Sequence, residues 1–269
     1  MNVVAGIPIY SKNLSKEEKI SLEKCIMLLK CDIVFIAPQS LNVSWYKFFC
    51  SGKKRIRFER FDDLFFKDIE GYNMLLMSSV FYQRFLNYDY LFIHQLDVFI
   101  FRDELETWCS KNYDYIGAPW IETLWLENAY NLISNEILAS KNYFTRIFYR
   151  GIWRLKSINA SRVSVGNGGC SLRKVKYFYK RTRLNEQKKF KWKYNEDLFW
   201  SIYITLINPF FKKPSPKEAL KFAFDFNPQV CFDMNKQQLP FAAHAWFRND
   251  EVYKNNFNFW KHFITQPIS

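Results

Sequence analysis

The first hundred residues alternate between short apolar runs and segments with helical periodicity. Apolar runs of strand length occupy residues 3–10, 32–37, 55–61 and 88–93. Apolar residues recur at helical spacing over residues 16–30 and 68–86. Strand–helix–strand alternation is typical of βαβ units, so we predict an α/β fold with a mostly parallel central sheet flanked by helices.

Further along, residues 113–120 give a strand that leads into a Gly-Ala-Pro turn, and residues 163–172 give a strand that carries Gly166-Asn167-Gly168-Gly169. Helices are predicted over residues 174–189, which are basic, and over residues 195–207, with Asn195 as the N-cap. Near the start of the chain, Ser15 and Glu18 have the spacing of a capping box, which predicts that the first helix begins there.

The chain length and composition indicate one large domain. Its 269 residues are 49% hydrophobic and 20% aromatic, which is enough for a well-filled α/β core. No linker or internal repeat interrupts the pattern, so we predict a single domain over residues 1–269. Helical periodicity is weak over residues 121–162, and we predict a mobile excursion there.

Two features of the sequence indicate the cellular compartment in which the protein is located. No basic and apolar leader opens the chain, and no apolar run approaches the roughly 20 residues that span a bilayer. The six cysteines show no Cys-x-x-Cys pair and no zinc spacing, as expected for reduced, mostly buried thiols. We therefore expect a cytoplasmic protein.

The net charge of +13 is concentrated in one segment. Residues 140–193 contain 16 Lys and Arg and one acid, Glu186, and aromatic residues are interleaved with the bases. This composition suits the anionic inner surface of a membrane, to which the protein would bind peripherally. Nucleic acid would attract the same charges, and a solvated face would also explain them.

Asp97 is the first candidate for chemistry. It follows the apolar run Tyr90-Leu91-Phe92-Ile93, and an ionised carboxylate at the end of a core strand needs a cation, a donor or water. In parallel sheets, ligands bind at the carboxyl ends of the strands, where Asp97 would lie. An aspartate in an ordinary turn would also explain the pattern.

Three later features are each ambiguous. Gly168 and Gly169 require a sharp turn or the close approach of a ligand, although a plain bulge has the same requirement. Glu196 and Asp197 suit the first turn of a helix, and either could also be a general base. His244 could bind a metal through neutral imidazole or be a core residue with satisfied hydrogen bonds.

The order of these features resembles a family of bacterial glycosyltransferases of the GT-A fold that is catalogued mainly as a domain of unknown function. The matching elements are Ile7-Pro8-Ile9-Tyr10, Gly71-Tyr72-Asn73, Tyr88-Asp89-Tyr90 through Gln95-Leu96-Asp97, Asp114-Tyr115-Ile116-Gly117-Ala118-Pro119-Trp120, Gly166-Asn167-Gly168-Gly169, Asn195-Glu196-Asp197 and His244-Ala245-Trp246. They extend over roughly residues 3–250, apart from 121–162.

The resemblance implies a nucleotide-sugar donor, a divalent metal (Mn²⁺ or Mg²⁺) and an acceptor hydroxyl on a glycan or a lipid-linked glycan. It implies that Asp97 and His244 bind the metal and that Glu196 or Asp197 acts on the acceptor. The residues that it assigns to donor binding are Ile7, Pro8, Tyr10, Tyr72, Asn73, Gln95, Gly168 and Gly169. Many GT-A enzymes have Asp-x-Asp where this chain has Gln95 before Asp97. We therefore expect metal dependence with a lowered affinity for the metal.

Two other classes of protein remain open at this point. A nucleic-acid-binding protein could use residues 140–193, although no helix-turn-helix, RRM or zinc spacing accompanies them. An inactive carbohydrate-binding module of GT-A-like fold could have lost its metal site at Gln95. Direct displacement with inversion is the simplest chemistry for an active enzyme, and retention stays open as the alternative.

Overall fold

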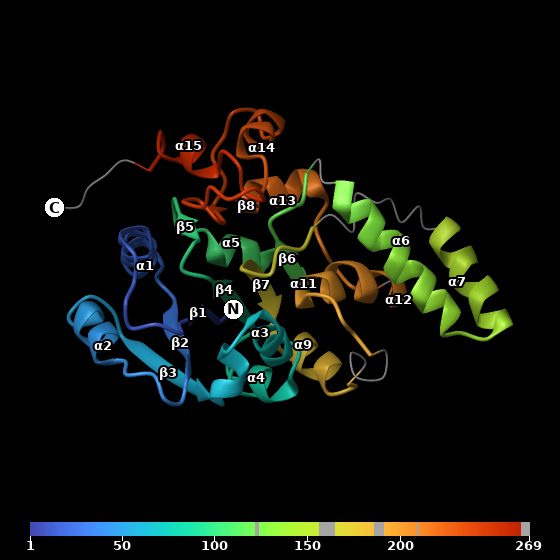
Figure 1. Cartoon of the computed structure of the whole chain (residues 1–269), viewed down its shortest axis with the longest axis horizontal. Coiled ribbons are helices and arrows are strands. Elements are labelled where there is room, and N and C mark those ends of the chain that lie inside the picture. Colours follow the sequence, from blue (N-terminus) through green and yellow to red (C-terminus); the bar gives the residue numbers. More distant parts are fainter. Residues whose placement is uncertain (122–123, 156–164, 186–190, 209, 265–269) are drawn as a thin grey trace.

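A six-stranded sheet forms the centre of the computed structural model, which describes residues 1–121, 124–155, 165–185, 191–208 and 210–264 (Figure 1). The strand order is β3-β2-β1-β4-β7-β6. The bounds are β1 (Val3–Pro8), β2 (Asp32–Pro38), β3 (Ile56–Phe61), β4 (Tyr90–His94), β6 (Tyr115–Gly117) and β7 (Cys170–Lys174). Strands β1 to β4 are parallel, and β7 pairs antiparallel with β4 and β6. The predicted α/β fold with a mostly parallel sheet is confirmed.

Helices cover both faces of this sheet. On one face lie α1 (Lys16–Leu28), α2 (Ser44–Cys50) and α5 (Leu105–Ser110). On the other lie α3 (Ile69–Leu76), α4 (Ser79–Gln83), α9 (Val175–Thr182) and the π-helix η2 (Phe199–Ile204). The remaining elements are the 3₁₀-helix η1 (Asp63–Phe66), α6 (Leu124–Ala139), α7 (Tyr143–Leu155), α11 (Glu196–Leu198), α12 (Thr205–Ile207), α13 (Pro216–Phe222), α14 (Pro228–Met234) and α15 (Asn256–Trp260).

The apolar sequence of the central strands supplies both cores. Successive strand residues point to opposite faces, so Val4 and Val34 join one hydrophobic cluster while Ala5 and Phe35 join the other. A smaller sheet, with the order β5-β9-β8, lies under the C-terminal segment. Its strands are β5 (Phe99–Ile100), β8 (Ala223–Phe224) and β9 (Ala242–Ala243).

The capping box at the start of α1 is confirmed. Ser15 Oγ accepts a hydrogen bond from the Glu18 amide at 3.1 Å, and Glu18 Oε2 accepts one from the Ser15 amide at 2.7 Å. The prediction of one helix over residues 68–86 is wrong, because α3 and α4 are separate. Ser78 adopts an extended conformation and caps α4 by accepting from the Phe81 amide. Both helices bury apolar residues in the same cluster, so the helical periodicity continued across the break.

The glycine segment lies in the loop before β7, not within a strand over residues 163–172. Asn167 shapes this loop by accepting from the Cys170 amide at 3.0 Å. The predicted helix over residues 174–189 ends at Thr182 as α9, and residues 186–190 lie outside the described residues. The helix predicted over residues 195–207 is present as α11, η2 and α12, with Asn195 at its N-cap.

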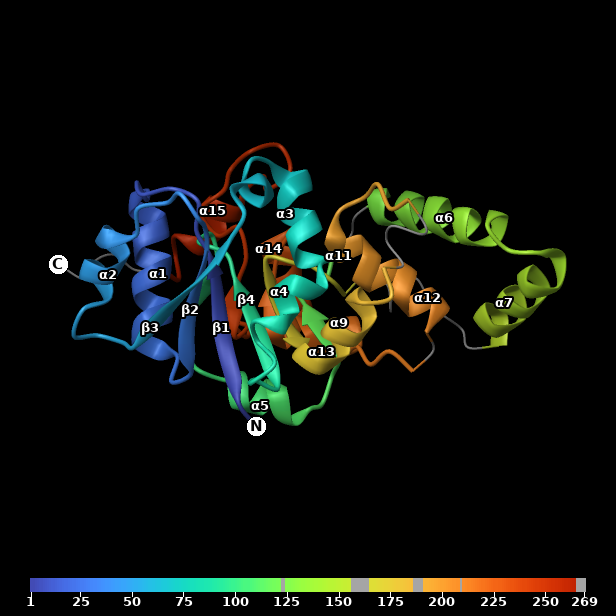
Figure 2. The same ribbon diagram turned by 90° about the horizontal axis from the view of Figure 1, so that it is seen from below.

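Residues 121–162 include two regular helices, in spite of their weak periodicity. Helices α6 and α7 extend away from the sheet at the end of the molecule opposite α2 (Figures 1 and 2). Helix α6 is attached to the domain through Leu126, Ile133 and Ile137, which join the cluster that contains η2. The mobility of this segment stays a prediction. Over the described residues, no helix has both the length and the apolar character that crossing a membrane requires.

Candidate active site

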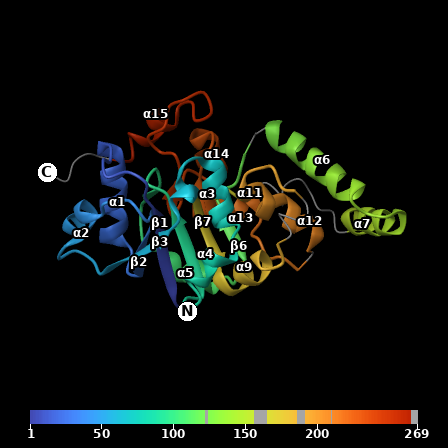
Figure 3. The same ribbon diagram turned by 60° about the horizontal axis from the view of Figure 1, so that its bottom comes forward.

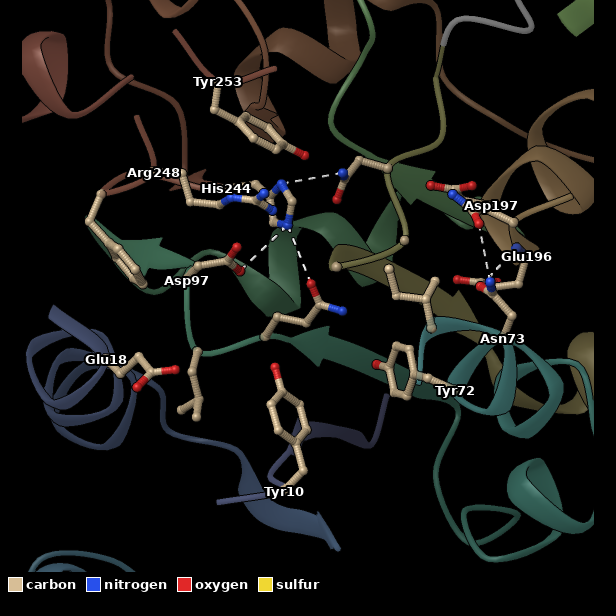
Figure 4. Close-up of a pocket in the computed structure, with 18 residues that line it drawn as sticks. Tyr10, Glu18, Tyr72, Asn73, Asp97, Glu196, Asp197, His244, Arg248 and Tyr253 are labelled. Atoms are coloured by element: carbon tan, nitrogen blue, oxygen red, sulfur yellow. Dashed lines mark hydrogen bonds and ion pairs between the residues drawn. The ribbon is translucent and has the colours of Figure 1, made fainter. Parts of the chain in front are cut away.

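A cavity of about 410 Å³ lies beyond the carboxyl ends of β1 and β4 (Figure 4). This is where ligands bind in open α/β sheets. Ten of the twelve site residues that the sequence predicted line it: Tyr10, Tyr72, Asn73, Gln95, Asp97, Gly168, Gly169, Glu196, Asp197 and His244. Ile7 and Pro8 do not line the cavity. Both lie within β1, where Ile7 is fully buried in the core and Pro8 pairs with Ile36 of β2.

Three polar side chains converge on one side of the cavity. Asp97 Oδ1 is 3.5 Å from His244 Nε2, and Gln95 Oε1 is 3.4 Å from the same nitrogen. Asp97 Oδ1 is buried and accepts no hydrogen bond within the described part of the chain. Gly169 packs directly against these side chains, because a Cβ there would collide with Gln95 Oε1 and with His244 Nε2.

The carboxylate of Asp225 and the amide of Asn167 hold the His244 imidazole from its Nδ1 side. His244 Nδ1 lies 2.7 Å from Asp225 Oδ1. Asn167 Nδ2 contacts both groups, because it donates to Asp225 Oδ2 at 3.0 Å and lies 3.3 Å from His244 Nδ1. Burial alone would lower the pKa of His244, but the charges of Asp97 and Asp225 raise it to about 9. A histidine that is anchored through Nδ1 directs Nε2 at a fixed point, which is the usual arrangement around a metal-binding imidazole.

The backbone beside His244 is strained, and a buried amide supports it. Ala245 has φ 51°, in the left-handed region that non-glycine residues seldom adopt. Asn256 is fully buried, and its Nδ2 donates to the carbonyls of Asp225 and Ala245 at 2.8 and 3.3 Å. One strained residue of the chain therefore lies directly beside the candidate metal ligand.

The residues present fit a divalent cation that a ligand helps to coordinate. Asp97 offers a carboxylate oxygen without a hydrogen bond, Gln95 an amide oxygen and His244 an imidazole nitrogen, which suit Mn²⁺ or Mg²⁺. No three His, Cys, Asp or Glu side chains of the described residues gather closely enough to hold a metal. The other ligands would therefore come from water or from a bound phosphate. A cation that binds His244 Nε2 would also have to displace the proton from that nitrogen.

Glu196 is committed to a buried ion pair. Its two carboxylate oxygens accept from Arg173 Nη2 at 2.7 Å and from Nη1 at 3.2 Å, and both side chains are almost fully buried. Arg173 Nη2 also donates to the carbonyl of Gly168 at 3.1 Å. Gly168 itself has no room for a Cβ, which would collide with Glu196. The pair therefore holds the glycine loop in place.

Replacing Glu196 with glutamine is expected to lower the free energy of unfolding by about 3 kcal/mol, because it leaves a buried guanidinium unpaired. The measurement is urea unfolding followed by circular dichroism. Glu23→Gln is the matched control, since its pair with Lys53 is partly exposed and should change stability by less than about 0.5 kcal/mol. Equal effects of the two substitutions would contradict the structural role of Glu196.

Asp197 faces the cavity from the start of α11. Its Oδ1 accepts from the Leu198 amide at 2.8 Å. The pKa of Asp197 is raised to about 7, mainly because burial desolvates the carboxylate, and the charge of Glu196 adds to the rise. A carboxylate of this kind can take a proton near neutral pH. Asn73 supports the same helix start, since its Oδ1 accepts from the Glu196 amide at 3.1 Å.

Sequence reasoning missed several residues that line or support the cavity. They are Glu18, Asn167, Arg173, Asp225, Arg248 and Tyr253. Arg173 carried a signal, because a lone arginine in an otherwise buried strand needs an acidic partner. The others lie in loops or short elements whose contacts no periodicity reveals.

Comparisons with solved structures define the class of fold. The chain is similar to a galactosyltransferase, LgtC, with bound donor and acceptor sugar analogues (TM-score 0.51, 10% identity, 100% of this chain and 98% of that chain). It is also similar to mouse xyloside xylosyltransferase 1 (TM-score 0.50, 9% identity, 94% and 99%) and to the glycosyltransferase GlyE of Streptococcus pneumoniae TIGR4 (0.51, 10%, 99% and 61%). The fold is therefore that of the GT-A glycosyltransferases, as the resemblance implied.

The family is shown by sequence. A family model described as "Protein of unknown function (DUF5672)" matches residues 55–244, and this chain belongs to that family. The matched range contains Asp97, the glycine loop, Asp197 and His244. Among curated proteins, no match to the sequence was found.

Proposed function

We propose that this protein is a glycosyltransferase that moves a sugar from a nucleotide-diphosphate sugar to a hydroxyl of a glycan or lipid-linked glycan, with Mn²⁺ or Mg²⁺. We take a UDP-sugar as the donor and the cytoplasm as the compartment, with lipopolysaccharide or capsule synthesis as the setting. The convergence of Gln95, Asp97 and His244 beside Gly169, in a fold of glycosyltransferases, supports the proposal most directly.

Each group at the cavity has a role in this reaction. A divalent ion held by Asp97 and His244 would stabilise the negative charge that develops on the departing nucleoside diphosphate. Asp197 accepts the proton of the acceptor hydroxyl, whose oxygen bonds to the anomeric carbon as the bond to the diphosphate breaks. Direct displacement of this kind inverts the anomeric centre. Gly168 and Gly169 line the cavity with backbone alone, so we propose that the donor sugar lies close to this backbone.

A second cavity supplies a route for the acceptor. It measures about 890 Å³ and shares Ile69, Asn73 and Asn195 with the first. Trp192 and Tyr194 are among its lining residues, and aromatic rings offer apolar faces with polar edges that suit sugar rings. We propose that the acceptor lies in this second cavity with its hydroxyl directed toward Asp197.

The test is release of nucleoside diphosphate from a panel of UDP-, GDP- and CMP-sugars, with and without Mn²⁺. We expect turnover of one UDP-sugar that needs the metal. If no sugar turns over, calorimetric titration of UDP with Mn²⁺ separates two cases: binding indicates a missing acceptor, and no binding rejects the proposed function. Glycan binding that is indifferent to Mn²⁺ would instead indicate a carbohydrate-binding module.

A further inference from the structure

Helix α7 exposes four large apolar side chains to solvent. Tyr143, Phe144, Ile147 and Phe148 are 71%, 81%, 52% and 62% exposed. They are spaced i, i+1, i+4 and i+5, so they lie along one side of the helix, which we call the α7 outer face. Among the described residues, none covers this face.

The opposite side of α7 fixes its orientation. Trp153 Nε1 donates to the carbonyl of Leu206 at 3.0 Å, and Trp153 packs against the cluster that contains η2. The Tyr149 ring contacts the Trp153 ring, with centroids 6.0 Å apart. The outer face therefore points outward because its helix is anchored by other residues.

The charged residues of α7 itself have one sign. Helix α7 contains three arginines and no acid, and the chain from residue 140 to residue 185 contains no acid at all. Arg150 is exposed beside the outer face. Arg146 is exposed as well, and its guanidinium donates to the carbonyls of Lys141 and Ala139 at the end of α6. Exposed aromatic residues flanked by arginines complement an anionic interface.

The shape of this region favours a flat partner. Helices α6 and α7 form a projection at the end of the molecule in all three views (Figure 3). A single strand of nucleic acid binds in a groove that follows its backbone, whereas α7 lies on a projection. A projecting helix can reach a planar surface without a clash from the rest of the domain.

We propose that the α7 outer face inserts into the headgroup region of an anionic bilayer while the flanking arginines contact its phosphates. One apolar or one electrostatic contribution alone gives weak binding, and α7 supplies both. Helix α6 connects α7 to η2, the helical segment that follows Asp197, so the cavity would be held at a fixed distance from the membrane. The proposal does not depend on turnover of a sugar donor.

The test is flotation of the full chain with vesicles of phosphatidylcholine alone or mixed with phosphatidylglycerol. Phe144→Ser is the test variant and Phe48→Ser is the matched control, since Phe48 is 82% exposed on α2 at the other end of the molecule. We expect the wild type and the control to float with anionic vesicles only. Phe144→Ser should lower the partition coefficient about tenfold, and Arg150→Gln should lower it as well.

Salt separates the electrostatic contribution to membrane binding from the apolar contribution. Raising the ionic strength to about 1 M, where the Debye length falls to about 3 Å, should weaken binding of the wild type. Binding that is unaffected by Phe144→Ser, or equal binding to neutral vesicles, would overturn the proposal. Absence of vesicle binding, together with self-association in ultracentrifugation that Phe144→Ser abolishes, would also overturn it and assign the face to a second copy of the chain.

Discussion

Asp97→Asn is expected to lower the rate of nucleoside diphosphate release about 10³-fold. The carboxylate supplies the negative charge of the candidate metal site, and Gln95 beside it is already neutral. Asparagine keeps the size of the side chain but removes the charge, so the fold should be preserved. The measurement is steady-state turnover at saturating Mn²⁺, with calorimetric titration of UDP and Mn²⁺ in parallel.

Asp233→Asn is the control for this experiment. Asp233 lies exposed on α14 and does not line the cavity, and its carboxylate accepts a hydrogen bond from Gln229 of the same helix. Its substitution should leave the rate unchanged within about twofold, as is usual for surface positions. Full metal-dependent activity in Asp97→Asn would contradict the metal-binding role of Asp97.

The second large effect concerns pH and Asp197. A base must be deprotonated to accept a proton, and the pKa of Asp197 is raised to about 7. The wild-type kcat/KM should therefore increase as the pH rises through about 7 and level off above it. Asp197→Asn should lower kcat by about 10²- to 10⁴-fold and remove this dependence, because asparagine accepts no proton.

The pH profile of Asp233→Asn should match that of the wild type. If Asp197→Asn kept the same rise with pH, a different group would be responsible, and the assignment of the base would fail. Circular dichroism of both variants at each pH shows whether a loss of rate reflects unfolding.

The candidate site could be predicted where short sequence features stand at strand and helix ends. Asp97 follows a buried strand, Gly168 and Gly169 stand where a Cβ would collide with neighbouring side chains, and Asp197 lies in the first turn of a helix. Ile7 could not be placed correctly, because the alternation of side chains along β1 directs it into the core and only Tyr10, beyond the strand, reaches the cavity. A sequence pattern does not show where a strand stops facing the core and starts facing a ligand.

Asp225 could not be predicted at all. It follows Phe224 of β8 as His244 follows Ala243 of β9, and the parallel register pairs Phe224 with Ala243. That pairing brings the Asp225 carboxylate beside the imidazole. Each of these strands has two residues, which is too short for any periodicity to appear.

The roles of Glu196 and Asp197 were open in the sequence for a different reason. Two adjacent carboxylates at a helix start have the same local explanation. The two carboxylates have different roles because Arg173, which lies on β7, forms an ion pair with Glu196. The break between α3 and α4 was missed in a similar way, because apolar spacing reports the buried side and not the continuity of the helix.

The position of β7 has a consequence for the newly synthesised chain. The cavity draws on residues from Tyr10 to Tyr253, and the loop that closes it becomes fixed when β7 inserts between β4 and β6. Such distant pairings form late, after the local βαβ units. A chain still on the ribosome therefore has no complete cavity until nearly all of these residues have emerged. The activity that we propose would accordingly report only molecules in which these pairings have formed.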